Sequence, residues 1–418
     1  MGKTFSEKIL GKKAGKPVVA GEIVEIEPDV AMSHDNTAAI SKKFYSIGVK
    51  KVYDPDKHVI ILDHATPAAN AKFAQNHKDI REFVAEQNVK NFYDIERGIC
   101  HQVMHEEGHV LPGTLIVGSD SHTTSYGAFG AFSAGIGRSE MAVIMARGKI
   151  WLKVPETIKI HVSGKFPKGL SAKDLVLKIA GEIGADGALY KAIEFCGPTI
   201  EDMSLSGRFV LTNMAVELGA KAGYVVPDQK TLDYIKTVSD KEFEIVKSDD
   251  DADFDQVINI DVSTMEPMVA KPHTVDNVAP ISEVKGKKIN QVFFGSCTNG
   301  RVEDFEQIID IIDGKQIHPD VRMVVFPASK KVYKAILKKG WVEKLVDFGA
   351  VMMNPGCGPC MGNHAGILAD DEVAVATSNR NFKGRLGNKN SFVYLASPRT
   401  AAYCALKGEI ADFRELDS

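Results

Sequence analysis

The sequence feature that most constrains the fold is a regular alternation of short apolar runs with segments of helical periodicity. The runs Val59–Leu62 and Thr114–Val117 have the length of strands, and helical patterns follow them at Ala68–Glu86 and Glu140–Ile150. The alternation returns later in the chain at Val292–Phe294, Glu303–Ile312, Met323–Phe326 and Lys330–Lys338. Such alternation is typical of α/β layers with largely parallel sheets, so we predict an α/β fold.

The length of the chain predicts more than one domain. A chain of 418 residues is too long for a single hydrophobic core, and two or three domains are expected. The composition shifts at Lys153–Glu156 and across the polar stretch Lys271–Lys287. We therefore predict three α/β domains, at residues 1–155, 156–283 and 284–418.

Charge and hydropathy exclude some classes of protein. The net charge is −4 and the isoelectric point is near 6.3, which does not favour binding to a nucleic-acid backbone. No apolar stretch approaches the roughly 18 residues that a membrane span needs. The N-terminus has no apolar secretory core, so a cytoplasmic protein is expected.

Three of the six cysteines form a candidate metal site. Cys357 and Cys360 lie in a Gly/Pro-rich C-x-x-C turn, and Cys297 lies upstream in a second polar turn. A zinc site with His364 as a further ligand is one interpretation, and a thioredoxin-like redox pair is another. An iron–sulfur cluster held by three thiolates is the third. The spacing of the cysteines alone does not decide among these.

Polar motifs directly follow several of the predicted strands. Asp63 and His64 follow Val59–Leu62, and a second group at Asp120–His122 follows Thr114–Val117. Cys297 follows Val292–Phe294 in the same way. Because ligands of open α/β sheets bind at the carboxyl ends of strands, we expect these turns to converge on one cleft.

Five segments, in order along the chain, resemble the aconitase family. Gly295–Arg301 and Asn354–Cys360 resemble its two cluster-binding segments, and Leu62–His64, Gly118–Thr123 and Ser378–Arg385 resemble other active-site segments. The resemblance implies three α/β domains around an iron–sulfur cluster, with a fourth, mobile domain closing over the site.

The resemblance also implies a cofactor and a partner. It assigns Cys297, Cys357 and Cys360 to one [4Fe-4S] cluster, with one iron left open for substrate or water. A further domain of roughly 100–150 residues has no room before Ser418, so the two-chain branch is expected, in which a separate small subunit carries the fourth domain. The expected assembly is a heterodimer or heterotetramer.

The implied reaction removes water from a hydroxy acid and adds it back at the adjacent carbon. Isopropylmalate, in leucine biosynthesis, is the favoured substrate; homocitrate is second, and citramalate or dimethylmalate third. An RNA-binding iron sensor and a non-catalytic scaffold subunit are hypotheses from other classes. The net negative charge argues against the RNA-binding sensor. The intact cysteines and acid/base residues argue against the scaffold subunit.

By the same resemblance, a set of histidines and carboxylates does the acid–base work. Asp63 and His64 protonate the leaving hydroxyl, and Glu194 holds His122 or the iron-bound water. The predicted catalytic residues are Asp63, His64, His101, Asp120, His122 and Glu194. The base that removes the carbon-bound proton is expected on the partner subunit.

A second set implied by the resemblance contacts the substrate or supports the cluster. Arginine grips a carboxylate through two N–H groups, which suits a dicarboxylic substrate. The predicted residues are His34, Asp35, Ser121, Asn299, Asn379, Arg380 and Arg385. The alternatives are that Asp35 caps a helix starting near Thr37 and that the arginines belong to a solvated basic loop.

Overall fold

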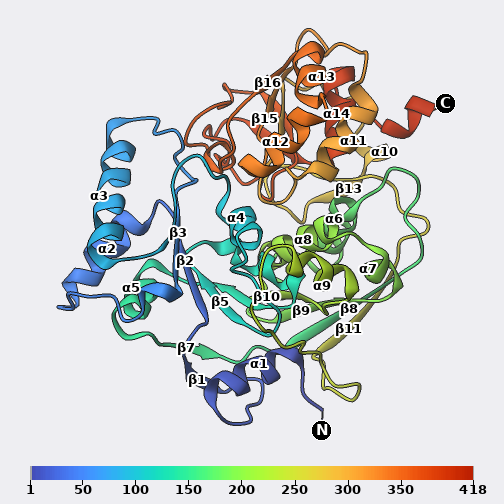
Figure 1. Cartoon of the computed structure of the whole chain (residues 1–418). Helices are drawn as coiled ribbons and strands as arrows, with labels where there is room; N and C mark the ends of the chain where they lie inside the picture. The colour runs from blue at the N-terminus through green and yellow to red at the C-terminus, as the bar shows by residue number, and fades with distance from the viewer. Residues whose placement is uncertain (1, 418) are drawn as a thin grey trace.

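The computed structural model describes residues 2–417, which form three main sheets with helices packed against them (Figure 1). The first sheet has five parallel strands in the order β4-β3-β2-β5-β6. Their bounds are Asn91–Tyr93, His58–Ile61, Val30–Ser33, Leu115–Gly118 and Phe132–Gly135. The helices in this part of the chain are α1 (Phe5–Ala14), α2 (Thr37–Ser46), α3 (Ala71–Gln87), α4 (Cys100–Glu106) and α5 (Arg138–Arg147), with η1 (Pro55–Lys57) and η2 (Ser121–Phe129) as 3₁₀ turns.

A second sheet of four parallel strands follows, in the order β10-β9-β8-β11. Its strands are Ala222–Val225, Ala192–Cys196, Thr157–Ser163 and Gln256–Asp261. Its helices are α6 (Ala172–Ile183), α7 (Pro198–Asp202), α8 (Leu205–Met214), η3 (Ala215–Leu218) and α9 (Gln229–Lys236). A small antiparallel pair, β1 (Ile23–Ile26) with β7 (Ile150–Lys153), lies beside α1 near the bottom of Figure 1.

The third sheet is mixed and has the strand order β13-β12-β18-β17-β14-β15-β16. The bounds, in that order, are Val278–Pro280, Met268–Ala270, Phe392–Leu395, Val373–Ala376, Gln291–Phe294, Arg322–Val325 and Ala350–Met352. Only the pairs that involve β12 are antiparallel. Its helices are α10 (Ile281–Val284), α11 (Val302–Ile312), α12 (Lys330–Lys338), η4 (Gly358–Met361), α13 (Trp341–Phe348), α14 (Pro398–Lys407) and η5 (Phe413–Asp417).

The predicted α/β fold is confirmed, but one predicted boundary does not match the sheets. The predicted second domain, residues 156–283, includes β12 and β13. Both strands instead pair with each other and with β18, so they form an edge of the third sheet. The change from the second sheet to the third therefore falls between β11 and β12.

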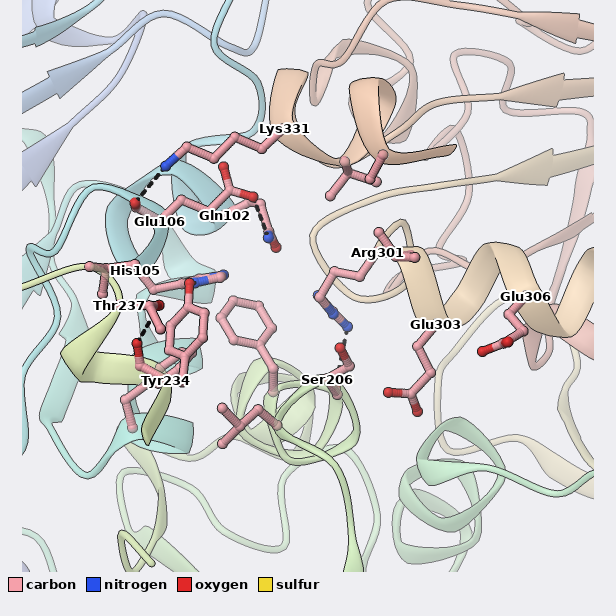
Figure 2. A pocket seen from close by; sticks show the side chains of 17 residues that line it. Gln102, His105, Glu106, Ser206, Tyr234, Thr237, Arg301, Glu303, Glu306 and Lys331 are labelled. Carbon is pink, nitrogen blue, oxygen red and sulfur yellow. Dashed lines mark hydrogen bonds between the residues drawn. The ribbon is translucent and has the colours of Figure 1, made fainter. Parts of the chain in front are cut away.

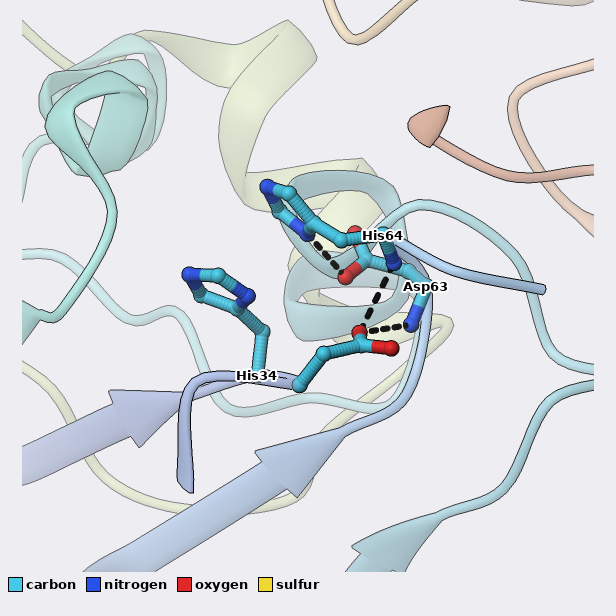
Figure 3. A group of neighbouring side chains, drawn as sticks. His34, Asp63 and His64 are labelled. Carbon is cyan, nitrogen blue, oxygen red and sulfur yellow. Dashed lines mark hydrogen bonds and ion pairs between the residues drawn. The ribbon is translucent and has the colours of Figure 1, made fainter. Parts of the chain in front are cut away.

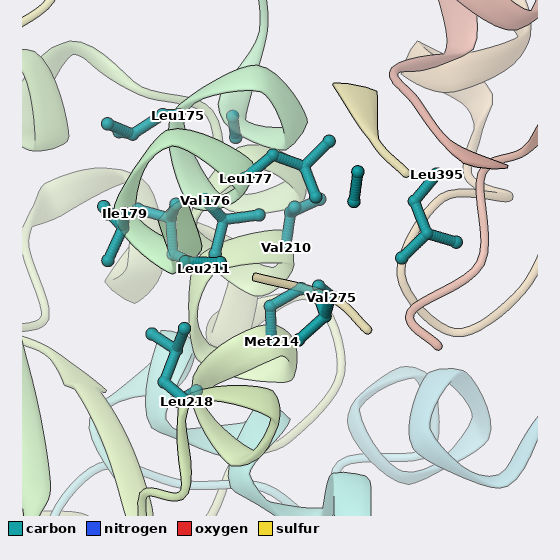
Figure 4. Close-up of a cluster of buried hydrophobic side chains, with 14 of the residues drawn as sticks. Leu175, Val176, Leu177, Ile179, Val210, Leu211, Met214, Leu218, Val275 and Leu395 are labelled. Carbon is teal, nitrogen blue, oxygen red and sulfur yellow. The ribbon is translucent and has the colours of Figure 1, made fainter. Parts of the chain in front are cut away.

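The second and third sheets share one hydrophobic core (Figure 4). Leu177 of α6 and Val210 of α8 belong to the same buried cluster as Leu395 of β18. Burying apolar surface stabilises the contact by roughly 25 cal/mol per Å², so this shared core fixes how the two parts of the chain are docked. None of the helices within residues 2–417 is both long and apolar enough to cross a bilayer.

Candidate active site

The polar turns after three neighbouring strands meet at one edge of the first sheet. β2, β3 and β5 are adjacent and parallel, so their carboxyl ends point the same way. His34 follows β2, the pair Asp63–His64 follows β3, and Asp120 follows β5. Figure 3 shows the rings of His34 and His64 beside each other above the strand ends. Two of the three turns that were predicted to converge, those after β3 and β5, therefore meet at this edge together with the turn after β2.

Asp35 fixes the turn that carries Asp63 and His64. Its carboxylate accepts hydrogen bonds from the backbone N–H groups of Asp63 at 2.9 Å, His64 at 2.8 Å and Ala65 at 3.1 Å. It also accepts one from His77 Nε2 at 2.8 Å. Burial alone would raise the pKa of Asp35, but these partners hold it below its usual range. The N-cap position of α2 is occupied by Asn36, which makes no side-chain capping hydrogen bond, so Asp35 orients the active-site turn and does not cap this helix.

His64 is poised as a proton donor. Its Nδ1 donates to Asp63 Oδ1 at 2.5 Å, and its Nε2 lies 3.4 Å from Asp120 Oδ2. Burial lowers the pKa of His64, but the charges of Asp63 and Cys357 and the hydrogen bonds that His64 donates to Asp120 and Asp63 outweigh it, so the pKa lies well above its ordinary value. The structure therefore favours a protonated His64 near neutral pH.

The neighbouring histidine is held in the opposite protonation state. The ring of His34 stacks on that of His64 with 3.8 Å between centroids. Burial, together with the charge of His64, lowers the pKa of His34 to about 4. A neutral imidazole and an imidazolium thus lie side by side, and a neutral ring can accept a hydrogen bond where its neighbour donates one.

Asp120 joins His101 and His122 in a second group. Its Oδ1 accepts from His101 Nε2 at 2.7 Å and from the backbone N–H of His122 at 2.8 Å. His101 Nδ1 also lies 3.0 Å from the hydroxyl of Tyr126. Burial would raise the pKa of Asp120, but His101 and the hydrogen bonds hold it well below the usual value. Asp120 therefore remains ionised and fixes the orientation of both rings.

The carboxylate beside His122 is Glu217, not Glu194 as predicted. Glu217 Oε1 lies 2.7 Å from His122 Nε2 and 2.7 Å from Arg380 Nε. Glu194 is in the middle of β9, where its side chain accepts a hydrogen bond from Ser248 Oγ at 2.5 Å. The predicted contact of Glu194 with His122 is therefore absent, because β9 turns the Glu194 side chain towards the segment beside α1, where Ser248 Oγ also accepts a hydrogen bond from the N–H of Phe5.

Two functional candidates escaped the sequence analysis. Asn213 and Glu217 are four residues apart on the continuous helical segment formed by α8 and η3. Asn213 Nδ2 donates to Cys297 Sγ at 3.2 Å, and Glu217 holds His122 and Arg380. The sequence pattern that could have identified them is a pair of polar residues one helical turn apart in an otherwise apolar stretch.

The three predicted cluster cysteines are buried and surrounded by N–H donors. Asn379 Nδ2 donates to Cys297 Sγ at 3.2 Å, and Asn379 Oδ1 lies 3.5 Å from Cys360 Sγ. Arg385 Nη2 donates to Cys360 Sγ at 3.3 Å. The backbone N–H of Cys357 donates to the carbonyl of Asp63 at 2.8 Å, which joins the cluster site to the acid–base residues. Donors aimed at sulfur stabilise thiolates, the form that binds metal.

The sulfur positions fit a group larger than a single ion. Tetrahedral zinc holds its thiolates less than about 4 Å apart. Within residues 2–417, the groups whose ligand atoms all lie within 4.8 Å of one another are two histidine–aspartate groups, and neither contains a cysteine. The three sulfurs, with or without His364, therefore do not converge on one ion. Three spaced soft ligands with N–H donors around them fit an iron–sulfur cluster.

Arg380 and Asn299, which were also predicted to contact substrate or support the cluster, form defined hydrogen bonds in the structure. Arg380 Nη2 donates to Ser121 Oγ at 3.0 Å, so the loop after β17 meets the loop after β5. Asn299 Nδ2 donates to Asp304 at 2.8 Å, which braces the Cys297 turn against α11. Arg380 is paired and half-buried, so it does not belong to a freely solvated loop. A role of Asn299 towards substrate stays a prediction.

A separate cavity of about 900 Å³ borders the Cys297 turn (Figure 2). Gln102, His105 and Glu106 of α4 line this cavity, whereas His101, Asp120 and His122 do not. Arg301 faces His105 across this cavity, and its Nη1 donates to the carbonyl of Cys297 at 2.9 Å. The cavity is thus distinct from the acid–base cluster, and Arg301 braces the turn from this side.

The fold and this site define the class of the protein. The chain matches the aconitase family (aconitate hydratase) over residues 7–288 and 282–408, and it belongs to that family. Membership of this family implies an iron–sulfur cluster.

The relatives narrow the class further. The chain is 52% identical to "3-isopropylmalate dehydratase large subunit 1" of Methanopyrus kandleri, over 99% of both chains. It is 50% identical to "Probable 3-isopropylmalate dehydratase large subunit" of Methanothermobacter thermautotrophicus, over 98% of both. It is also 46% identical to "Methanogen homoaconitase large subunit" of Methanocaldococcus jannaschii, over 98% of this chain and 99% of that protein. A crystal structure of Thermococcus kodakaraensis aconitase X has a TM-score of 0.49 and 13% identity, covering 91% of each chain, and adds nothing to the assignment.

Proposed function

We propose that this chain is the large subunit of a 3-isopropylmalate dehydratase, a hydro-lyase that interconverts 2-isopropylmalate and 3-isopropylmalate by removing and re-adding water. The observation that carries the dehydratase reaction is the contact between the cysteine site and the His64–Asp63 pair, through the Cys357 N–H and the Asp63 carbonyl. The full-length relatives named for this activity support the choice of substrate.

The proposal assigns one [4Fe-4S] cluster to Cys297, Cys357 and Cys360. When bound, such a cluster supplies a Lewis-acidic iron without a protein sulfur, where a hydroxyl and a carboxylate can be polarised. The amides of Asn213 and Asn379 and the guanidinium of Arg385 donate to the thiolates. These donors offset the negative charge of the ligands within a buried site.

His64 supplies the proton for the leaving hydroxyl. Its Nδ1 proton is held by Asp63, which leaves the Nε2 proton for transfer. Asp63 is itself held by the Cys100 N–H at 2.7 Å, at the first turn of α4, where the helix dipole favours a negative charge. The ring orientation and the protonated state are thus set before substrate arrives, which is the requirement for general acid catalysis near neutral pH.

Arg380 binds a substrate carboxylate in this proposal. Glu217 holds its Nε and Ser121 accepts from its Nη2, so the guanidinium plane is fixed. A fixed guanidinium offers paired N–H donors to a carboxylate with little loss of side-chain entropy. His34, neutral and beside His64, is assigned a second contact to substrate.

A separate small subunit completes the enzyme in this proposal. The relatives that match the chain over nearly their whole length are named large subunits. We assign to the partner the base that removes the carbon-bound proton and the contacts to the variable substituent of the substrate. Homoaconitase is the second candidate function, because relatives with that name are 46% identical.

The first experiment measures metal content. Chain purified without oxygen should carry about four irons and four sulfides, since three thiolates suit a four-iron cluster. Cys297→Ser should lose the iron, whereas Cys404→Ser, a buried cysteine of α14 outside the site, should keep it. Stoichiometric zinc in place of iron, or full iron in Cys297→Ser, would contradict the proposal.

The second experiment separates the candidate substrates. The chain is combined with its small subunit, and kcat/KM is measured for 3-isopropylmalate, homocitrate and citramalate. We expect 3-isopropylmalate to give the highest value. Preference for homocitrate would replace the proposal with the homoaconitase reaction and leave the cluster assignment intact.

A further inference from the structure

Lys173 is a wholly buried lysine that the acid–base scheme does not use. It is the second residue of α6 and is 0% exposed. Its Nζ donates to the carbonyls of Thr377 at 3.1 Å and Ser378 at 2.6 Å. Among the side chains that the structure describes, no carboxylate forms an ion pair with Lys173. Lysine is seldom fully buried unless an anion is near, because desolvating an ammonium is costly.

The two carbonyls belong to the turn that reaches the cysteines. Thr377 and Ser378 follow β17 directly, and the next residue is Asn379. The Asn379 amide contacts the sulfurs of Cys297 and Cys360. The Lys173 ammonium therefore fixes the backbone directly before Asn379, and the side chain of Asn379 contacts two of the proposed cluster ligands.

The charges around Lys173 come mainly from the same site. Burial lowers the pKa of Lys173 to about 7, and the groups that oppose this effect are, in order, Cys297, Cys360, Asp304 and Glu217. The two leading groups are cysteines, which carry negative charge only as thiolates. The negative charge that would stabilise the buried ammonium is therefore that of the cysteine thiolates and of the cluster proposed to bind to them.

We propose that Lys173 is a positioning residue whose ammonium is the counter-charge of the cluster and holds the Thr377–Ser378 turn so that Asn379 reaches both sulfurs. This inference rests on the proposed function. Three thiolates carry more negative charge than the oxidised cluster core carries positive charge, so the assembly is anionic. One buried cation nearby stabilises it, and stabilises the reduced form most.

The test measures the reduction potential of the cluster in full-length chain purified without oxygen. Lys173→Met removes the charge and the hydrogen bonds, Lys173→Gln removes the charge but keeps an N–H donor, and Lys173→Arg keeps the charge. Lys178→Met is the matched control, because Lys178 is on the same helix, is partly exposed and pairs with Glu182 at 2.6 Å. The potential is determined by a redox titration followed by electron paramagnetic resonance.

Both neutral variants should have a more negative potential than the wild type and lose iron faster in air, because cluster potentials depend on net charge and hydrogen bonds. Lys173→Arg and Lys178→Met should keep the wild-type potential. Neutral variants that cannot hold iron but retain the wild-type far-ultraviolet circular dichroism would also support the inference. Loss of that spectrum would show a merely structural role and overturn it.

The outcomes distinguish this inference from the proposed function. A wild-type chain that binds no iron when purified without oxygen would contradict the proposed function. A wild-type chain with a cluster, and an unchanged potential in Lys173→Gln, would overturn the inference alone.

Discussion

Each carboxylate of the active site forms hydrogen bonds or ion pairs with more than one group. Asp35 holds three backbone N–H groups and His77, and Asp63 holds His64 and the N-terminus of α4. Asp120 orients His101 and His122, and Glu217 joins His122 to Arg380. Hydrogen bonds to charged groups contribute about 1.5–3 kcal/mol each, so removal of one carboxylate should affect several side chains together.

Glu217→Gln should lower kcat/KM by roughly 10- to 150-fold, which corresponds to about 1.5–3 kcal/mol. The variant keeps the size of the side chain but removes the charge that His122 and Arg380 share. Steady-state kinetics with the small subunit present measure the effect. Glu194→Gln is the control, since Glu194 contacts Ser248 instead of the site, and it should keep kcat/KM. Equal losses in the two variants would contradict the assignment of Glu217.

Arg380→Lys should raise KM although the positive charge is kept. The guanidinium uses Nε for Glu217 and Nη2 for Ser121, and one ammonium cannot reproduce this planar arrangement and also bind a carboxylate. A loss of about 1–3 kcal/mol in binding, roughly 5- to 150-fold in KM, is expected. An unchanged KM would remove Arg380 from the substrate site.

At the residue scale, the alternation of strands and helices predicts the polar residues in turns after strands, but it does not predict the polar residues on α8 and η3. Asp63, His64 and Asp120 were found because each follows an apolar run, and a parallel sheet brings such positions to one edge. Glu217 was missed and Glu194 chosen in its place because no local pattern marks which buried carboxylate faces a given histidine. That choice depends on how the second sheet docks on the first.

At the scale of elements, strong periodicity gave accurate bounds. The predicted helix Lys330–Lys338 is α12, where Ser329 caps the first turn by accepting the Val332 N–H at 3.1 Å. The predicted strand Val59–Leu62 is β3 shifted by one residue. In the second sheet, β8 has a period-two alternation of buried and partly exposed residues that is typical of a strand, whereas β10 is only Ala-Gly-Tyr-Val and has no clear signal.

β3 carries a buried histidine that predicts an acid-sensitive fold. Burial lowers the pKa of His58 to about 4, with Asp54 opposing the shift and Lys57 adding to it. In the unfolded chain the histidine binds a proton below a pKa of about 6.5. The stability from neutral His58 is therefore fully present above about pH 6.5 and is lost as pH falls towards 4, at about 1.4 kcal/mol per pH unit.

His58→Leu should consequently make the free energy of unfolding less dependent on pH between about 6.5 and 4. Urea unfolding followed by circular dichroism at several pH values measures this dependence. The variant should approach the wild type near pH 7 and exceed it at pH 5. Parallel curves for the two proteins would contradict the account of His58.

At the scale of the whole molecule, each of the three parts of the chain contributes a different function to one site. The first sheet provides the histidines and aspartates, and α8 with η3 provides Asn213 and Glu217. The third sheet provides the cysteines and Arg380. The site therefore exists only when all three parts are docked, and binding of a cluster should stabilise that docking.

The central claim is that this chain becomes a dehydratase only together with a small subunit. The most direct measurement titrates cluster-loaded chain with purified small subunit, without oxygen, and follows the unsaturated intermediate formed from 3-isopropylmalate by ultraviolet absorbance. The chain alone should show almost no turnover, because it lacks the proposed base, and positioning with general base catalysis contributes several orders of magnitude in rate. Activity should rise with added small subunit and level off near an equimolar ratio. Full turnover by the chain alone, or none at any ratio with the cluster intact, would contradict the account.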